Sequence, residues 1–271
     1  MILDWHSAYI VTTPLAIRAM ELLFALNLGI QTLEYWRIRP ATQGRGLWIW
    51  SIQRQDIPHP SLRQFLDTLF TPTSFSALLA LRLLALLSVA IQGGHLWSIG
   101  FLFVSNLAIL IRWRGAFNGG SDFMTLVVLT GLLIAQLVSH FASPELGWRA
   151  CFWYITIQSI TSYFMSGSVK LLKREWRDGR AMTIFLNGAI HGPLRTNHWL
   201  RKPWVAVISS WSFILWESAA PLALLDARLA MVFCTIAALF HFLVFWYFGL
   251  NRFFWAWLAT FPAIVWCAGQ I

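Results

Sequence analysis

Charged residues are scarce in this chain. Asp, Glu, Lys and Arg make up 11% of its 271 residues, whereas hydrophobic residues make up 58%. Because charged residues form about a quarter of an ordinary soluble domain, the composition excludes a soluble protein and indicates an integral membrane protein. Residues 233–250 are apolar almost throughout and do not alternate with polar residues. That pattern excludes the strands of an outer-membrane barrel and leaves helices.

Cysteine is also rare, and no catalytic signature of fixed spacing occurs. The three cysteines, Cys151, Cys234 and Cys267, lie far apart, so we expect buried thiols and no metal clip. His191 and His198 lie seven residues apart in a loop without a carboxylate or cysteine at metal-ligand spacing, and no metal is expected there. The sequence contains no phosphate-binding loop, nucleophile elbow or HExxH motif.

Acidic residues are outnumbered, with 11 Asp and Glu against 20 Lys and Arg and a net charge of +9. The basic residues are spread over loops next to apolar stretches, whereas a nucleic-acid-binding protein gathers them on one soluble face. We therefore expect no nucleic acid partner. Anionic lipid headgroups are the expected partners of such juxtamembrane charges.

Eight apolar stretches are long enough to cross about 30 Å of hydrocarbon at about 1.5 Å per residue. They predict an all-α fold, a polytopic membrane helix bundle of about eight transmembrane helices in one membrane domain covering residues 1–271. The stretches are 14–36, 74–92, 96–113, 121–142, 149–172, 205–225, 229–250 and 253–271.

Two hydrophilic stretches, residues 37–73 and 173–204, are predicted to lie at the membrane interface. The first holds two short amphipathic pieces, around 47–55 and 62–70, separated by Pro58 and Pro60. Most basic residues fall in these loops and after the third apolar stretch. Because Lys and Arg resist translocation, this distribution predicts that the loops are cytoplasmic and both termini non-cytoplasmic.

The end of the fifth stretch carries a lysine on a polar helical face. Tyr163, Ser166, Gly167 and Lys170 share this face because they are spaced at i, i+3 or i+4, and i+7. The ordinary interpretation of Lys170 is an anchor whose amine reaches the headgroups. The functional interpretation is a partly desolvated amine that acts as a base.

Glu217 lies twelve residues into the sixth stretch, roughly 18 Å deep at about 1.5 Å per residue. A charge at that depth is either paired or functional. The structural interpretation pairs it with Arg82, which lies roughly 12 Å deep in the second stretch. The functional interpretation is a carboxylate that handles a proton. Lys170 lies only about 3 Å from the same boundary, so a Lys170–Glu217 pair would require a tilted helix or a cavity. Arg18 and Glu21, spaced i, i+3, are expected to pair or to face the bundle interior.

Residues 118–122, Asn-Gly-Gly-Ser-Asp, predict a turn followed by the N-cap of the fourth helix. Ser121 or Asp122 would accept backbone N–H groups there. The two glycines would also suit an anion-binding nest.

Three segments carry a resemblance to a known family. The first is Tyr163-Phe164, Gly167, Lys170, Trp176, Gly179 and Met182; the second is the glycine-aspartate turn at 118–122; the third is Glu217 with Pro221. In this order, and over roughly residues 110–225, the chain resembles the membrane part of the vitamin K-dependent gamma-carboxylases. It also resembles the related bacterial horizontally transferred transmembrane (HTTM) proteins, some of which mature secreted peptide toxins.

The resemblance implies an enzyme of the bacterial inner membrane that acts on a reduced quinone, or on another lipophilic or peptide substrate. Lys170 would be the base, Glu217 would handle a proton and Tyr163 would orient the substrate. The substrate-binding residues would be Ser166, Trp176, Asp122 and His191. In the carboxylases the matching lysine faces the lumen, whereas the charge distribution here places Lys170 at the cytoplasmic face.

The alternative is a non-catalytic membrane subunit or peptide-maturation factor. Small and polar residues at helical spacing suit a protein whose helices pack against a partner membrane protein equally well. A secreted peptide is the other partner that this alternative implies.

Overall fold

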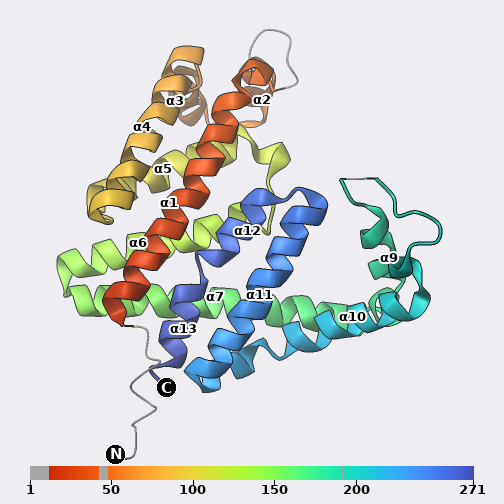
Figure 1. The fold of residues 1–271 in the computed structure, drawn as a ribbon. Coiled ribbons are helices and arrows are strands. Elements are labelled where there is room, and N and C mark those ends of the chain that lie inside the picture. Colours follow the sequence, from red (N-terminus) through yellow and green to blue (C-terminus); the bar gives the residue numbers. More distant parts are fainter. Residues whose placement is uncertain (1–11, 43–47, 191) are drawn as a thin grey trace, which may run out of the picture. The chain divides into compact units, whose positions relative to one another are not determined.

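The computed structural model describes residues 12–42, 48–190 and 192–271. Within these residues the chain forms thirteen α-helices, short 3₁₀ turns and no β-strand (Figure 1). The predicted all-α fold is thus confirmed for the described part of the chain. The chain divides into two compact units. We call Ile17–Cys151 the N-terminal unit, and Phe152–Ile271 with the described residues up to Ala16 the C-terminal unit.

The N-terminal unit is built from six helices, among which α5 packs against both α4 and α6. Two of them, α3 and α4, begin at prolines, Pro60 and Pro72. Proline suits this position because the first helical N–H has no intrahelical partner. The helices are α1 (Thr13–Arg37), α2 (Trp50–Gln53), α3 (Pro60–Leu69), α4 (Pro72–Gln92), α5 (Leu96–Arg112) and α6 (Asp122–Phe141), with 3₁₀ turns at Arg39–Thr42, Arg54–Asp56 and Arg114–Ala116.

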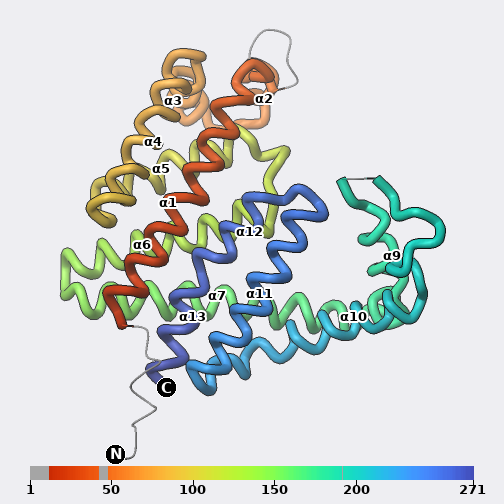
Figure 2. Tube along the Cα trace, viewed as in Figure 1, coloured from red at the N-terminus to blue at the C-terminus, as the bar shows by residue number. Residues whose placement is uncertain are grey.

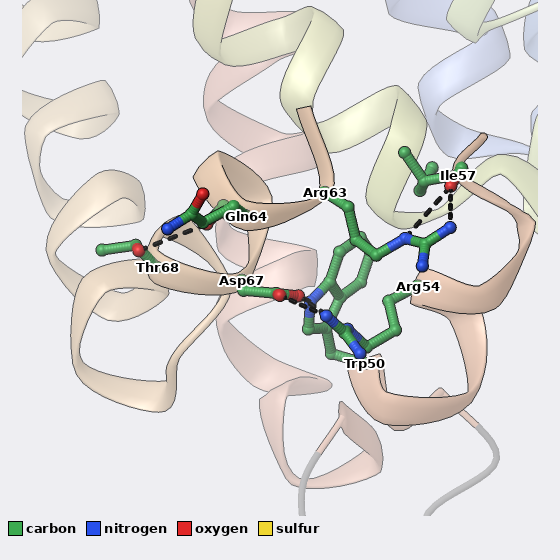
Figure 3. A network of polar contacts seen from close by, with 7 residues as sticks. All are labelled: Trp50, Arg54, Ile57, Arg63, Gln64, Asp67 and Thr68. Atoms are coloured by element: carbon green, nitrogen blue, oxygen red, sulfur yellow. Dashed lines mark hydrogen bonds and ion pairs between the residues drawn. The ribbon is translucent and has the colours of Figure 1, made fainter. Parts of the chain in front are cut away.

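We call residues 48–70 the α2–α3 corner; Figure 3 shows its polar contacts. Asp67 accepts hydrogen bonds from the indole N–H of Trp50 at 2.7 Å and from Arg54 at 2.9 and 2.5 Å. Arg63 donates twice to the carbonyl of Ile57, at 3.1 and 2.5 Å. The Arg54 guanidinium, followed by the Trp50 N–H, holds the pKa of the Asp67 carboxyl below its ordinary value of 3.8. The second predicted amphipathic piece is α3, whereas the described residues of the first form the single turn of α2 and the start of the 3₁₀ turn Arg54–Asp56.

The middle of the N-terminal unit holds a buried arginine. Arg82 on α4 is fully buried and donates to three neutral side chains, Ser105 at 2.8 Å, Gln31 at 3.2 Å and Thr32 at 3.4 Å. Gln31 in turn donates to Asp122 at 3.3 Å. The buried charge is therefore connected to a carboxylate through one amide.

The C-terminal unit contains most of α7 and all later helices. Its core is α11, which runs beside α12 and α13 (Figure 2), while α10 packs against α8 and α9. The helices are α7 (Pro144–Leu172), α8 (Arg174–Arg177), α9 (Arg180–Asn187), α10 (Pro203–Ser218), α11 (Ala227–Phe248), α12 (Asn251–Leu258) and α13 (Phe261–Ala268), with 3₁₀ turns at Trp199–Arg201 and Ala220–Leu225.

Four helices of the described chain are long and apolar enough to cross a membrane, namely Thr13–Arg37, Pro72–Gln92, Asp122–Phe141 and Ala227–Phe248. Every predicted stretch contains a helix, but the count of eight spans is not confirmed. α5 is shorter, and α7 is rich in Ser, Thr and Gln. α10 gives way to a 3₁₀ turn before Pro221, and the last stretch breaks between α12 and α13, just before Pro262. Proline ends helices because it lacks an N–H.

Candidate functional site

Lys170 lies near the last turn of α7, on a face that packs against α10. The contact is close because of Gly167: a Cβ placed there would lie 2.5 Å from the backbone nitrogen and 2.6 Å from the hydroxyl of Ser218. Distances under 3 Å are far inside van der Waals contact, so only glycine fits without a shift of the backbone. The absence of a side chain at Gly167 therefore allows α7 and α10 to approach, with Lys170 and Glu217 on the facing surfaces.

The Lys170 amine forms an ion pair with the Glu217 carboxylate. It also donates to the Ser166 hydroxyl at 2.6 Å, and the ring centroid of Trp176 lies 5.1 Å from Nζ. The side chain of Lys170 is 15% exposed and that of Glu217 5%. Four of the predicted site residues thus come together, and the amine is largely shielded from solvent.

The position of Glu217 differs from the depth expected from its sequence position. The first half of α10 packs on the segment after α7: Ser210 donates to the carbonyl of Trp176, and Trp211 donates to that of Arg177 at 3.1 Å. α10 therefore reaches the end of α7 only at its own C-terminal end, where Glu217 lies. Counting depth from the first residue of the helix placed the carboxylate too far from Lys170. The structural interpretation paired Glu217 with Arg82; within the C-terminal unit Glu217 pairs with Lys170, and the described partners of Arg82 lie in the N-terminal unit.

The turn between α8 and α9 positions Trp176. Gly179 adopts a φ of +80°, in the left-handed region that glycine enters without strain. Asp178 accepts from the Arg180 backbone at 3.1 Å and from its guanidinium at 2.8 Å. The backbone N–H of Arg180, and then its side chain, hold the pKa of Asp178 below its ordinary value of 3.8.

Tyr163 lies two helical turns before Lys170, about 10 Å along the axis at 1.5 Å per residue. Its hydroxyl lies 2.6 Å from Nε2 of His241 on α11. Aromatic rings surround the pair, with centroids 4.5 Å from that of Tyr163 for Trp257, 5.1 Å for Phe233 and 5.3 Å for Trp216. His241 is 1% exposed. His241 is not among the site residues predicted from the sequence, although an ionisable side chain in the middle of an apolar helix is the signal that identifies such a residue.

Several buried polar atoms around these rings have no hydrogen-bond partner among the described residues. They are Nδ1 of His241, the indole N–H groups of Trp216 and Trp257, and the hydroxyl of Ser218. Buried polar groups are normally paired, so each such atom is informative. Donors set among aromatic rings can hold the oxygens of a flat, partly polar molecule.

Asp122, a predicted substrate-binding residue, belongs to the N-terminal unit. It accepts from the backbone N–H of Asn118 at 2.8 Å, and Asn118 accepts from Gly120 and Ser121 at 2.9 and 3.0 Å. The predicted turn is confirmed. The N-cap differs in detail, because the Ser121 side chain makes no capping bond to α6. His191, the remaining predicted residue, lies outside the described residues.

The predicted Arg18–Glu21 pair is confirmed, with an N–O distance of 3.6 Å. All three cysteines are buried and none forms a disulfide. In the described part of the chain, no three His, Cys, Asp or Glu side chains form a group that could hold a metal.

Comparison of the chain with protein-family models, curated proteins and solved structures finds no match. The resemblance to the carboxylases and HTTM proteins therefore stays a prediction from the sequence.

Proposed function

We propose that this protein is a carboxylase-like membrane enzyme in which Lys170 removes a proton from a membrane-soluble substrate such as a reduced quinone. The observation that supports the proposal is the shielded ion pair of Lys170 and Glu217 at the end of α7. A lysine that only anchors a span extends its amine into the headgroups. Here the amine instead turns onto a carboxylate of a neighbouring helix.

The pair suits proton transfer because the amine and the carboxylate are in direct contact, so a proton can pass between them without an intervening group. With the proton on Glu217, the neutral Lys170 amine accepts a proton from an acidic hydroxyl. Glu217 then releases its own proton toward solvent through the exposed edge of the pair, and its carboxylate pairs again with the protonated Lys170 amine. Ser166, bound to Nζ at 2.6 Å, fixes the direction of the amine lone pair.

In the proposal, the quinone ring binds among the residues near Tyr163. Trp216 and Trp257 bring aromatic surfaces and unpaired N–H donors, and Tyr163 with His241 brings a hydroxyl and an imidazole. A bound reduced quinone supplies a weakly acidic ring hydroxyl. In the proposal, Trp216 and Trp257 hold the ring oxygens, Trp176 covers the amine, and Lys170 holds the transferred proton.

We also propose the finer membrane arrangement. All eight apolar segments cross a bacterial inner membrane, with α10 and the α12–α13 pair as interrupted spans. Irregular backbone is tolerated within a membrane where it is buried in protein. The basic loops face the cytoplasm and anionic headgroups, and both termini lie on the opposite side.

The second candidate is a non-catalytic subunit or peptide-maturation factor that binds a partner membrane protein or a secreted peptide. The close α7–α10 contact at Gly167 favours it, because there the ion pair serves only to hold two helices together. The two candidates differ in what they require of Lys170: the enzyme needs an amine that can lose its proton, whereas the subunit needs only a positive charge.

The experiment replaces Lys170 by arginine, which keeps the charge and the pair but does not deprotonate near neutrality. Purified protein in detergent is mixed anaerobically with a short-chain reduced naphthoquinone, and the absorbance of the deprotonated ring is followed. We expect the wild-type protein to form the deprotonated species and Lys170→Arg to reduce its rate of formation by about 100-fold or more. The matched control is Lys173→Arg, an exposed lysine at the same helix end, which should behave as the wild type.

A Lys170→Arg protein that deprotonates the probe as fast as the wild type would contradict the enzyme proposal and favour the subunit. An equal loss of the deprotonation rate in Lys173→Arg would show that the effect is not specific to Lys170, and it would also contradict the enzyme proposal.

A further inference from the structure

A cavity of about 280 Å³ lies in the N-terminal unit, beside the α2–α3 corner. Trp50, which lines the cavity, donates its indole N–H to Asp67, as Figure 3 shows. The walls combine two arginines, two hydroxyl side chains and aromatic rings, namely Arg39, Arg112, Thr42, Ser51, Trp50 and Phe70.

The two arginines have no carboxylate partner among the described residues. Arg112, which is 1% exposed, donates to the Gln53 side chain and, at 2.5 Å, to the carbonyl of Trp48. Arg39 donates to the carbonyl of Trp36 at 3.1 Å and to Ser76 at 2.7 Å. Each guanidinium is thus held by neutral groups, and its charge is not balanced by them.

The acidic residues of the corner are already paired elsewhere. Asp67 is bound by Arg54 and Trp50, and Asp56 by Arg114 at 2.6 Å. An arginine buried without a counter-charge is unfavourable, because its guanidinium has lost water and gained no anion. An anion in the cavity would supply the missing charge to both arginines.

We infer that this cavity binds the phosphate group of an anionic lipid between Arg39 and Arg112. The planar guanidinium matches phosphate oxygens with paired N–H donors, and the hydroxyl of Ser51 can donate to the same group. Trp50 and Phe70 offer an apolar wall for the glycerol and the first acyl carbons. Basic pockets beside membrane helices bind anionic headgroups in this way. A free phosphate ion presents the same group to the two arginines, so the experiment must distinguish it from the lipid.

The inference is independent of the proposed function, because none of its residues belongs to the Lys170 site. The test is a titration of delipidated protein in detergent with dioctanoyl phosphatidylglycerol, with bound lipid counted by native mass spectrometry. Arg39→Gln is the deciding variant, because Arg39 is only half-buried and its loss is the less disruptive; Arg112→Gln is the companion. Arg37→Gln is the matched control, because Arg37 is an exposed arginine two residues away that does not line the cavity.

We expect Arg39→Gln to weaken phosphatidylglycerol binding about tenfold or more, the loss of one charged hydrogen bond to an anion, and Arg37→Gln to change it less than about twofold. Phosphatidylcholine should bind more weakly than phosphatidylglycerol. If inorganic phosphate displaces the lipid with the same dependence on Arg39, the site is confirmed and free phosphate is its ligand source; if phosphate does not displace it, the source is the lipid.

Equal affinity of the wild-type protein and Arg39→Gln would overturn the inference. Equal losses in Arg37→Gln and Arg39→Gln would do the same, because they would show unspecific attraction between charges. Binding of phosphatidylcholine as tight as that of phosphatidylglycerol would also overturn it, because both lipids carry the phosphate and only phosphatidylglycerol has a net negative charge.

Discussion

The two units each hold a buried basic side chain, but they balance its charge in different ways. Arg82 in the N-terminal unit is fully buried and bound by three neutral side chains, and one of these, Gln31, connects it to the Asp122 carboxylate. Lys170 in the C-terminal unit is 15% exposed and touches its carboxylate directly. One basic group is fixed in a network of neutral side chains, and the other forms an ion pair with one carboxylate.

The difference follows from the chemistry of the two side chains. A guanidinium keeps its proton and uses several N–H donors in fixed directions, so it suits a permanent polar core. A lysine amine can lose its proton, so beside Glu217 it suits transfer. We therefore expect Arg82 to contribute to stability alone, and Lys170 to contribute both to stability and to the proposed deprotonation.

The largest change in stability is expected from removing Lys170 alone. Lys170→Met leaves the Glu217 carboxylate buried without a cation, which should lower the free energy of unfolding by about 3–5 kcal/mol. The double variant Lys170→Met/Glu217→Gln removes both charges and should recover most of that loss. Thermal unfolding in detergent, followed with a thiol-reactive dye on the buried cysteines, measures both. If the double variant is no more stable than the single one, the two charges are not coupled.

Arg82→Lys should show the opposite balance of effects. The single amine cannot reach all three acceptors of the guanidinium, so we expect a loss of about 1–3 kcal/mol with unchanged probe deprotonation per folded molecule. Mass spectrometry of labelled thiols identifies the affected unit, because Cys151 lies in the N-terminal unit and Cys234 and Cys267 in the C-terminal one. Cys151 should be labelled first. If folded Arg82→Lys protein no longer deprotonates the probe, Arg82 is also needed for that reaction, and the proposed difference between Arg82 and Lys170 is wrong.

Gly167→Ala tests whether the close helix contact is what brings Lys170 to Glu217. The added methyl would meet backbone atoms of Ser218 and Glu217 at 2.5–2.9 Å, so we expect a loss of about 1–3 kcal/mol with early labelling of Cys234 and Cys267. Gly100→Ala is the control, since nothing lies within 4 Å of its added methyl and alanine favours a helix by about 1 kcal/mol over glycine. Equal behaviour of the two variants would show that the helices do not meet at Gly167.

The smallest effect concerns the partly exposed Arg54–Asp67 pair in the N-terminal unit. Because the pKa of Asp67 is lowered in the folded protein, its bonds to Arg54 and Trp50 stabilise the α2–α3 corner above the ordinary pKa of 3.8. That stabilisation is lost as the pH falls through the lowered pKa. Hydrogen exchange of α3 should therefore increase at the acid end of the range. In the Asp67→Asn variant, α3 should exchange faster at neutral pH, and its exchange should no longer change as Asp67 would titrate. If the pH dependence persists in this variant, another group causes it.

The sequence predicted where the helices lie and which face of α7 carries the polar residues, because both follow from hydrophobic periodicity. It failed at the partner of Glu217. Depth was counted as if α10 entered the membrane at its first residue, whereas its first half packs on α8 and α9. The contact of Tyr163 with His241 was missed for a related reason: periodicity gives the face of a helix but not the neighbour that the face meets.

The shielding of Lys170 also governs its reactivity toward reagents dissolved in water. Acylation requires an uncharged, accessible nitrogen, and here the nitrogen is bound by Glu217 and Ser166 and covered by Trp176. A water-soluble acylating compound can therefore modify this residue only when the contact with Glu217 briefly opens. The rate of that modification, compared with the rate at exposed Lys173, measures how often the contact between Lys170 and Glu217 opens.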